Sequence, residues 1–239
     1  GVEDFALTFT SSEATSNFAV GDITATGGDG CTLAAFGASG GSTTVYTATC
    51  APDNAGETVN VLVAADKYTD TASNDNTVSN TFDWTYEIVA PTMAITSTAG
   101  TADGGTSSVA AFALTFTSNE VTSNFAQADI TATGGDGCTL GDFAQGNTAA
   151  IYTATCTADD GDTVNVLVAA DKYTDTAGND NEASNTFDWT YDGTDPTMTI
   201  TSNTVASGGT TATAGVVLIY TSNEATINFV IGDITEGGD

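Results

Sequence analysis

The segment VNVLVAADKYTDTA at residues 59–72 recurs letter for letter at residues 164–177. The block SNTFDWTY at residues 79–86 recurs at residues 184–191 with the same offset of 105 residues. A third block, DITATGGDGCTL, also occurs twice, with an offset of 107 residues. A fixed period of this size indicates domains repeated in tandem, so the repeat is the unit from which the rest of the sequence is interpreted.

A shorter signal marks where each repeat begins. PTMAITS starts at Pro91 and the near copy PTMTITS starts at Pro196. We therefore predict a repeat without its opening strand at residues 1–90, a complete repeat at residues 91–195 and the N-terminal part of a third at residues 196–239. We expect this sequence to be a window on a longer array, and completion of a partial repeat by a neighbouring chain is the alternative.

The charge balance excludes several classes of function. The 239 residues include 31 acidic and two basic residues and no His, which gives a net charge of −29. Nucleic-acid binding and docking on anionic membranes require Lys and Arg, and most His-dependent catalysis is excluded as well. No stretch approaches 18 apolar residues, so no membrane insertion is expected. The charge predicts cations as small partners and a saline extracellular setting, where screening offsets self-repulsion.

Apolar and polar residues alternate at the period of a strand. Phe112, Leu114 and Phe116 alternate with the small residues Ala and Thr, as do Phe187 and Trp189 with Asp188 and Thr190. Such strands bury one face, and seven short strands in about 105 residues favour an all-β immunoglobulin-like sandwich. The predicted strands of the complete repeat are residues 92–97, 112–118, 125–133, 138–143, 151–156, 163–170 and 185–191.

These blocks together carry a family resemblance along the whole chain. The succession of TSxE, DITATGG, YTATC, VNVLVAADKYTDTAGNDN and TDP resembles the bacterial Ig-like repeats of large secreted surface proteins and adhesins. The resemblance implies a β-sandwich, secretion, and use as a stalk, a spacer or an adhesive array. The Cys pair within each repeat departs from the usual pattern of these repeats.

The four cysteines predict one disulfide per repeat. Cys31 and Cys50 flank a hairpin, and if they face each other the turn falls at Gly40–Gly41. In the second repeat Cys138 and Cys156 are placed in the same way, with the turn near Asn147. Closing a loop of this length stabilises a domain by about 3 kcal/mol, and disulfides suit an oxidising, extracellular compartment. Pairing between repeats or between chains is the alternative.

Acidic turns are the candidate metal sites. Carboxylate and amide oxygens close to a turn can bind Ca²⁺, which takes six to eight oxygens, and the resemblance to calcium-stiffened adhesin repeats supports this interpretation. The alternative is a solvated turn whose Asp and Asn side chains cap their own backbone. The linker at Asp192 and Asp195 is a further candidate, whereas the linker with Ile88 and Val89 is expected to stiffen by apolar packing. The candidate ligands are Asp66, Asp70, Asn74, Asp75, Asp171, Asp175, Asn179, Asp180, Asp192 and Asp195.

Repeated carboxylates elsewhere do not predict catalysis. Asp22, Asp129 and Asp233 open the DIT blocks and follow the glutamates of TSxE in each repeat. A pair of carboxylates is typical of glycosidases, but a catalytic pair rarely recurs in every repeat, so a capping or turn role is expected. Trp84 and Trp189 could stack on a sugar, although their alternation with aspartates favours the core.

The sequence therefore predicts a protein that is not an enzyme. The first hypothesis is a structural segment of an extracellular tandem array that forms a filament, appendage or stalk, whose partners are copies of itself or neighbouring repeats. The second is a cell-surface adhesin or binding module with calcium-stiffened repeats, whose ligand is a carbohydrate or another surface ligand. The face carrying VAADKYTD is identical between repeats while the Cys hairpin loops vary, which favours the first hypothesis.

Overall fold

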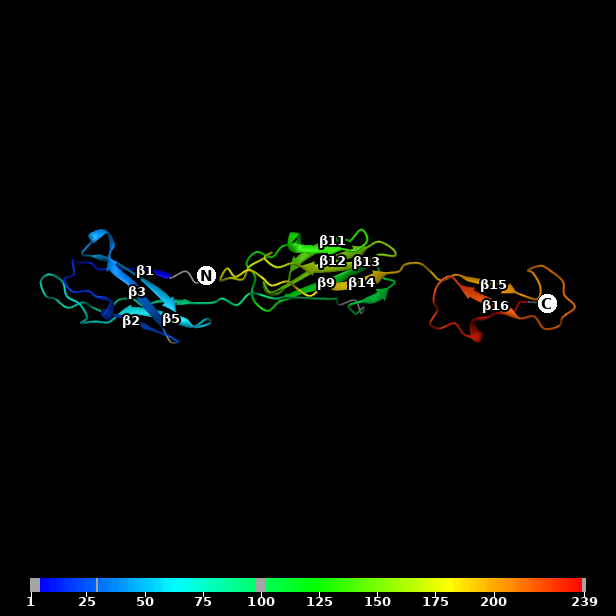
Figure 1. The fold of residues 1–239 in the computed structure, drawn as a ribbon, viewed down its shortest axis with the longest axis horizontal. Helices are drawn as coiled ribbons and strands as arrows, with labels where there is room; N and C mark the ends of the chain where they lie inside the picture. Colours follow the sequence, from blue (N-terminus) through cyan, green and yellow to red (C-terminus); the bar gives the residue numbers. More distant parts are fainter. Residues whose placement is uncertain (1–4, 29, 98–101, 238–239) are drawn as a thin grey trace. The chain divides into compact units, whose positions relative to one another are not determined.

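The chain folds into β-strands joined by turns (Figure 1). The structure is a computed structural model, and it describes residues 5–28, 30–97 and 102–237. Two compact units are present. The first comprises Gly1–Pro91, Thr122–Asn124 and Tyr173–Asn181, and the second comprises Thr92–Val121, Phe125–Lys172 and Glu182–Asp239.

The second unit contains two four-stranded sheets, in the orders β11-β12-β9-β7 and β10-β13-β14-β8. All neighbouring strands are antiparallel except β14 and β8, which are parallel. Two sheets with buried inner faces make the β-sandwich that the alternation predicted. The strands are β7 (Met93–Ser97), β8 (Gly105–Ser107), β9 (Ala111–Ser118), β10 (Ile130–Thr133), β11 (Cys138–Gln145), β12 (Ile151–Ala158), β13 (Thr163–Val168) and β14 (Phe187–Tyr191).

The core of this sandwich lies between the alternating apolar faces. Phe112, Leu114 and Phe116 of β9 are fully buried, and so are the three valines of β13. Trp189 of β14 is also fully buried, and its ring centroid lies 4.8 Å from that of Phe112. This confirms that Trp189 belongs to the core, so it offers no face on which a sugar could stack.

The first unit repeats this plan with fewer strands. Its two three-stranded sheets have the orders β1-β4-β3 and β2-β5-β6. The strands are β1 (Phe5–Thr10), β2 (Ile23–Thr26), β3 (Cys31–Ala38), β4 (Val45–Pro52), β5 (Thr58–Val63) and β6 (Phe82–Thr85). Within the described residues, no strand of this unit corresponds to β7 or β8.

The structure corrects one predicted strand and adds one that was not predicted. Residues 125–133 were expected to form one strand, but a 3-10 turn at Gln127–Asp129 precedes β10. The Oδ2 atom of Asp129 accepts a hydrogen bond of 2.8 Å from the backbone N–H of Ala126, and Asp22 and Asp233 do the same in the other two copies. The expected capping role of these aspartates is confirmed. Strand β8 was not predicted.

The predicted register of the Cys hairpin was wrong by two residues. Cys31 lies opposite Pro52, and Cys50 lies opposite Leu33. The disulfide therefore joins diagonal neighbours, whereas the prediction assumed that the cysteines face each other directly. A bulge between Ala34 and Gly37, where Ala35 takes a φ of 47°, shifts the register once more before the turn.

The C-terminal part of the chain forms a small sheet of two antiparallel strands. These are β15 (Met198–Ser202) and β16 (Leu218–Ser222), with Ile200 opposite Tyr220. A 3-10 turn at Ile231–Asp233 follows. Most of the large apolar side chains of this region are exposed, in contrast to the cores above.

In the part of the chain that the structure describes, no helix is long and apolar enough to cross a membrane.

Candidate functional site

The acidic turn of the first repeat is organised by the side chain of Asn76. Its Oδ1 accepts hydrogen bonds from the backbone N–H groups of Lys67 (2.8 Å) and Tyr68 (2.9 Å). Its Nδ2 donates to the carbonyl oxygens of Ala64 and Thr77, both at 2.8 Å. Because all of these partners are backbone atoms, Asn76 fixes the conformation of the turn rather than presenting its amide to a ligand.

Asp70 closes the same turn on itself. Its Oδ1 accepts hydrogen bonds of 2.8 Å from the backbone N–H groups of Ala72 and Asn74, and its Oδ2 accepts one of 2.8 Å from the side chain of Asn74. The side-chain hydrogen bond from Asn74, followed by that from the Asn74 backbone, lowers the pKa of Asp70. This is the self-capping turn that was the alternative to a metal site.

The second copy of the turn differs because Asp175 is buried. Oδ1 of Asp175 accepts hydrogen bonds from the backbone N–H groups of Gly178 (2.6 Å) and Asn179 (2.9 Å), and its Oδ2 accepts one from Nδ2 of Asn179 (2.9 Å). Burial raises the pKa of Asp175, but the hydrogen bonds from Asn179 and Gly178 outweigh it, so the pKa lies below its ordinary value. The buried carboxylate is thus held in its ionised form.

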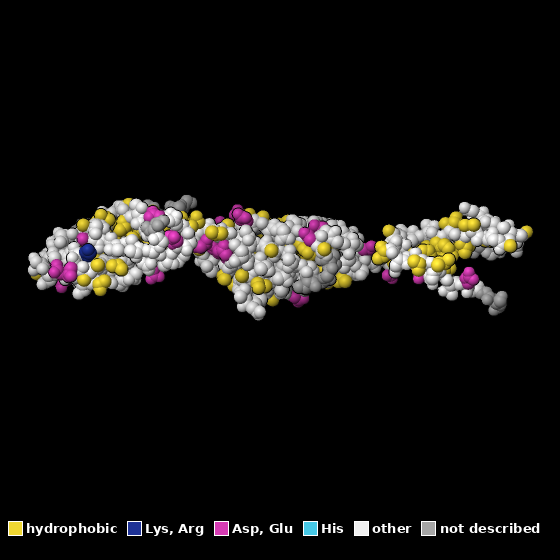
Figure 2. All heavy atoms as spheres, turned by 90° about the horizontal axis from the view of Figure 1, so that it is seen from below, with side chains coloured by type: hydrophobic (Ala, Val, Ile, Leu, Met, Phe, Trp, Pro, Cys, Tyr) yellow, Lys and Arg dark blue, Asp and Glu magenta, His cyan; other side chains and the backbone are white. Residues whose placement is uncertain are grey.

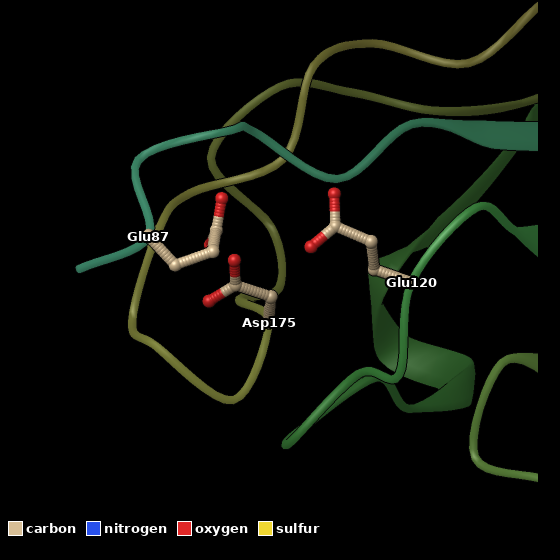
Figure 3. Close-up of side chains that lie close together, drawn as sticks. All are labelled: Glu87, Glu120 and Asp175. Carbon is tan, nitrogen blue, oxygen red and sulfur yellow. The ribbon is translucent and has the colours of Figure 1, made fainter. Parts of the chain in front are cut away.

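Glu87 lies beside this turn within the first unit (Figure 3). The Nδ2 atom of Asn179 donates to Oε2 of Glu87 at 2.6 Å, and carboxylate oxygens of Glu87 and Asp175 lie within 4.8 Å of each other. One amide group thus bridges two carboxylates. Glu120, also labelled in Figure 3, belongs to the second unit, where it follows β9.

The other predicted ligands are not brought together. Among the described residues of the first unit, Asp175 is the predicted ligand that lies close to another acidic side chain, that of Glu87. Asp66 and Asp171 are exposed residues with a φ of 59°, and Asp75 and Asp180 pair with the backbone of Thr69 and Thr174. Asn74 and Asn179 donate to the carboxylates of their own turns.

The linker candidates also serve local structure. Oδ1 of Asp192 accepts a hydrogen bond of 3.2 Å from the backbone N–H of Thr194, and Asp195 is exposed. Asp160, which was not predicted, accepts hydrogen bonds from the backbone N–H of Gly193 (2.6 Å) and the hydroxyl of Thr194 (3.0 Å). The bond from Gly193, then that from Thr194, lowers the pKa of Asp160. At the other linker Ile88 and Val89 are both exposed, and apolar packing between repeats there stays a prediction.

These donor sets fit calcium unequally. Ca²⁺ takes six to eight oxygen ligands, and a carboxylate whose oxygens already accept three N–H bonds offers few free lone pairs. Asp70 and Asp175 each accept three such bonds, so neither carboxylate alone supplies the ligands that the ion needs. At Asp175 a second carboxylate, that of Glu87, is present, so this is where the calcium prediction is worth testing. Sequence reasoning missed Glu87 as a neighbour of Asp175 because the two residues are 88 positions apart in the sequence.

Both expected disulfides are present. Cys31 is joined to Cys50, and Cys138 to Cys156, with Cα–Cα distances of 5.6 and 5.5 Å. Each bond ties β3 to β4, or β11 to β12, inside one repeat. The pairing is therefore within repeats.

Comparison with known proteins identifies the family of the chain. A family model described as a bacterial Ig-like domain matches residues 1–86 and 87–191. Among solved structures, one similar chain is described as FdeC, a novel broadly conserved Escherichia coli adhesin eliciting protection against urinary tract infections. It shares 14% sequence identity over 94% of this chain, with a TM-score of 0.34, and this chain spans 63% of its length. At that TM-score the likeness carries no functional argument. The sequence matched none of the curated proteins with which it was compared.

Proposed function

The chain belongs to the bacterial Ig-like domain family, and from this premise we propose that it is a structural segment of an extracellular tandem array. In this role each repeat is a spacer, and successive repeats build a filament, an appendage or a stalk. The observation that carries the proposal is the letter-for-letter identity of residues 59–72 and 164–177. A face that is the same in each copy suits repeated packing better than recognition of varied ligands.

The chemistry of the chain supports a secreted, non-catalytic role. Two disulfides are maintained in oxidising compartments, and a net charge of −29 is best tolerated where salt and divalent cations screen it. Acidic side chains are scattered over the visible face rather than gathered in one patch (Figure 2). The aspartates that open each DIT block cap turns, which leaves them no catalytic task in this proposal.

The proposal is tested on native material. Antibodies raised against this chain and coupled to gold particles should label filaments, stalks or a surface layer in electron micrographs of the source cells. Labelling at intervals along an extended structure is the expected result. Isolated particles with no regular polymer would overturn the structural role.

A binding role is the second candidate function, and it rests on the hairpin loops. Residues 34–44 and 141–150, which form the ends of β3 and β11 and the turns after them, differ between the repeats, whereas the sequences on either side are nearly identical. Variable loops on a constant scaffold are typical of recognition. Exchanging the two loops should change the binding of the labelled chain to glycan arrays or cell surfaces if these loops recognise a ligand. Unchanged binding after the exchange would exclude them as the binding site.

A further inference from the structure

The linker between the second and third repeats contains an Asp–Pro peptide bond. Proline occurs three times in the chain, and the residues before it are Ala51, Ala90 and Asp195. The bond between Asp195 and Pro196 is therefore the one Asp–Pro bond of the sequence. It lies at a boundary between repeats, whereas the equivalent bond at the first boundary joins Ala90 to Pro91. The two linkers thus differ at the side chain nearest to this bond.

Proline changes the chemistry that an aspartate can perform on its own chain. Before other residues, the next backbone N–H can attack the side-chain carboxyl group and form a succinimide. Proline has no backbone N–H, so this reaction is closed to Asp195. The carboxylate oxygen of Asp195 can instead attack the carbonyl carbon of its own residue and close a five-membered ring. Well-oriented intramolecular attack of this kind corresponds to an effective concentration of about 10⁵–10⁸ M.

The carboxylate of Asp195 is free for this reaction. Among the described residues it takes part in no hydrogen bond or ion pair. The two other carboxylates at this linker are engaged: Oδ1 of Asp192 accepts the N–H of Thr194 at 3.2 Å, and Asp160 accepts the N–H of Gly193 (2.6 Å) and the hydroxyl of Thr194 (3.0 Å). Asp195 is therefore the carboxylate of this linker that can act as a nucleophile.

Hydrogen bonds hold the chain on both sides of the Asp–Pro bond. Upstream, Thr194 is held by the contacts just described. Downstream, the N–H of Thr197 donates to Oδ1 of Asn223 at 2.6 Å, and the N–H of Asn223 donates to the carbonyl oxygen of Thr197 at 3.1 Å. The complete repeat has the same two bonds between Thr92 and Asn119, at the same distances. The downstream anchor is thus a property of the repeat itself, and the bond lies in a short segment between two fixed points.

Water must reach this position for the cleavage to be completed. Asp195 is exposed. Its counterpart Ala90, which precedes a complete repeat, is also partly exposed, although Pro91 after it is fully buried. The position before the proline therefore stays accessible to water even where the repeat that follows is complete.

We propose that the chain cleaves itself between Asp195 and Pro196 in acid. The carboxylate of Asp195 attacks its own carbonyl carbon, the C–N bond breaks, and the nitrogen of Pro196 leaves with a proton taken from the solvent. The first product ends in a cyclic anhydride at Asp195, and the second begins with the free amine of Pro196. Water then opens the anhydride and leaves two carboxyl groups on Asp195. The two steps together hydrolyse one peptide bond with one water molecule.

Acid promotes the step in which the bond breaks, because the leaving nitrogen must gain a proton. The pH dependence thus comes from the backbone amide rather than from the titration of a side chain, and the rate should rise from pH 7 to pH 4. Apart from Tyr191, the titratable groups on the elements at this linker are acidic, and their negative charge raises the local proton concentration. They are Asp192 on the linker, Asp159, Asp160 and Asp162 before β13, and Glu224 after β16.

This inference goes beyond the proposed structural role, which requires no cleavage. It gives an array of these repeats a site at which acid separates residues 196–239 from residues 1–195. The first boundary, with Ala90 before the proline, has no such site.

Intact-mass spectrometry of the purified full chain tests the cleavage. The chain, with both disulfides intact, is incubated at pH 4 and at pH 7 at 37 °C and sampled daily for a week. We expect two products, residues 1–195 and 196–239, whose masses sum to that of the chain plus one water molecule. They should form at least tenfold faster at pH 4. A chain that stays whole at pH 4, or equal rates at the two pH values, overturns the inference.

Three variants test the nucleophile. Asp195→Asn removes the carboxylate and should slow the cleavage at least tenfold. Asp195→Glu keeps the charge but requires a six-membered ring, and it should also slow the cleavage at least tenfold. The matched control Asp192→Asn removes a carboxylate from the same linker and should change the rate less than threefold. Equal rates in the three variants would indicate a contaminating protease and would overturn the inference.

A further variant tests the bond in front of a complete repeat. Ala90→Asp creates the same dipeptide at the first boundary, and a second cut between residues 90 and 91 should appear at a rate within tenfold of the first. Absence of this cut would show that a complete repeat protects the bond, and would overturn the inference for an array. Failure of these cleavage tests leaves the array role standing, whereas cleavage of the purified chain with no polymer in native micrographs would refute the array role alone.

Discussion

The two repeats contain identical strands whose surroundings differ. The sequence TVNVLV forms β5 in the first unit and β13 in the second, and its valines are buried in both. The adjoining strands FDWT diverge: Trp189 is fully buried, whereas Trp84 in the same block is only half-buried. In the second unit β7 and β8 flank the core. The long hairpins are present in both repeats, so they do not account for this difference. The short strands β7 and β8 complete the core around β14, the last strand of the second repeat.

The largest effect should come from removing one aromatic ring in each repeat. Phe187→Ala should destabilise the second repeat by about 3–5 kcal/mol, because the ring is almost fully buried. The matched variant Phe82→Ala should cost the first repeat about 1 kcal/mol, because water already reaches that ring. Hydrogen exchange followed by mass spectrometry on peptides from β4 and β12, whose sequences differ, measures each repeat separately. Equal losses in the two repeats would refute the role given to β7 and β8.

The disulfides should behave alike in both repeats. Replacing both cysteines by alanine should cost each repeat about 3 kcal/mol, because the closed loops span 19 and 18 residues. The same exchange measurement, made separately on the Cys31/Cys50 and Cys138/Cys156 double variants, checks this. A loss in one repeat much greater than in the other would mean that the bonds do more than close equivalent hairpins.

A smaller difference should separate the two acidic turns. Asp175→Asn should cost about 2 kcal/mol at pH 7, because a buried carboxylate loses its charge-assisted hydrogen bonds. Asp70→Asn serves as the control, because Asp70 is only partly buried, and should have less effect. Since the pKa of Asp175 is lowered in the folded state, its contribution is complete above the unfolded value of about 3.9 and is lost as the pH falls through the folded value.

Urea unfolding between pH 2 and pH 7 provides the measurement for these turns. The difference between the parent chain and Asp175→Asn should shrink as the solution is acidified below about pH 4. A difference that stays constant over this range would mean that the charge of Asp175 does not contribute.

Calcium should have the smallest effect, and its binding remains a prediction. For a dissociation constant of about 1 mM, typical of weak extracellular sites, 10 mM Ca²⁺ would stabilise the bound form by about 1.4 kcal/mol. The melting temperature should therefore rise with CaCl₂ and fall back with EGTA, and Glu87→Gln should abolish the rise, with Glu57→Gln as the control. A melting temperature that does not respond to EGTA would exclude structural calcium.

Much of the fold follows from the sequence because strands alternate and repeats align. The alternation at Phe112, Leu114 and Phe116 places β9 correctly, and the repeated blocks locate its counterpart β1. Strand β8 escaped prediction because its three residues, GTS, carry no apolar alternation. The hairpin register escaped it because bulges with a positive φ at Ala35 and Asp142 cannot be distinguished from ordinary strand residues.

The candidate site was predictable only in part. The self-capping of the Asp and Asn side chains in the turns was one of the two alternatives that the sequence left open, and their role as calcium ligands stays a prediction. The pairing of Glu87 with Asn179 depends on tertiary structure, since 92 residues separate them. The burial that distinguishes Asp175 from Asp70 likewise has no local signal, because the segments DKYTDTA around them are identical.

The disulfide has a mechanical consequence if repeats are pulled from their ends. Each bond bridges 18 or 19 residues in the middle of its repeat, well away from the points where force would enter. An extended chain spans about 3.3–3.6 Å per residue. Each disulfide therefore keeps roughly 60 Å of contour length from extending when its repeat unfolds under force. An unfolded repeat is therefore shorter from end to end than its number of residues implies. Reduction of the disulfide increases that length without any change of sequence.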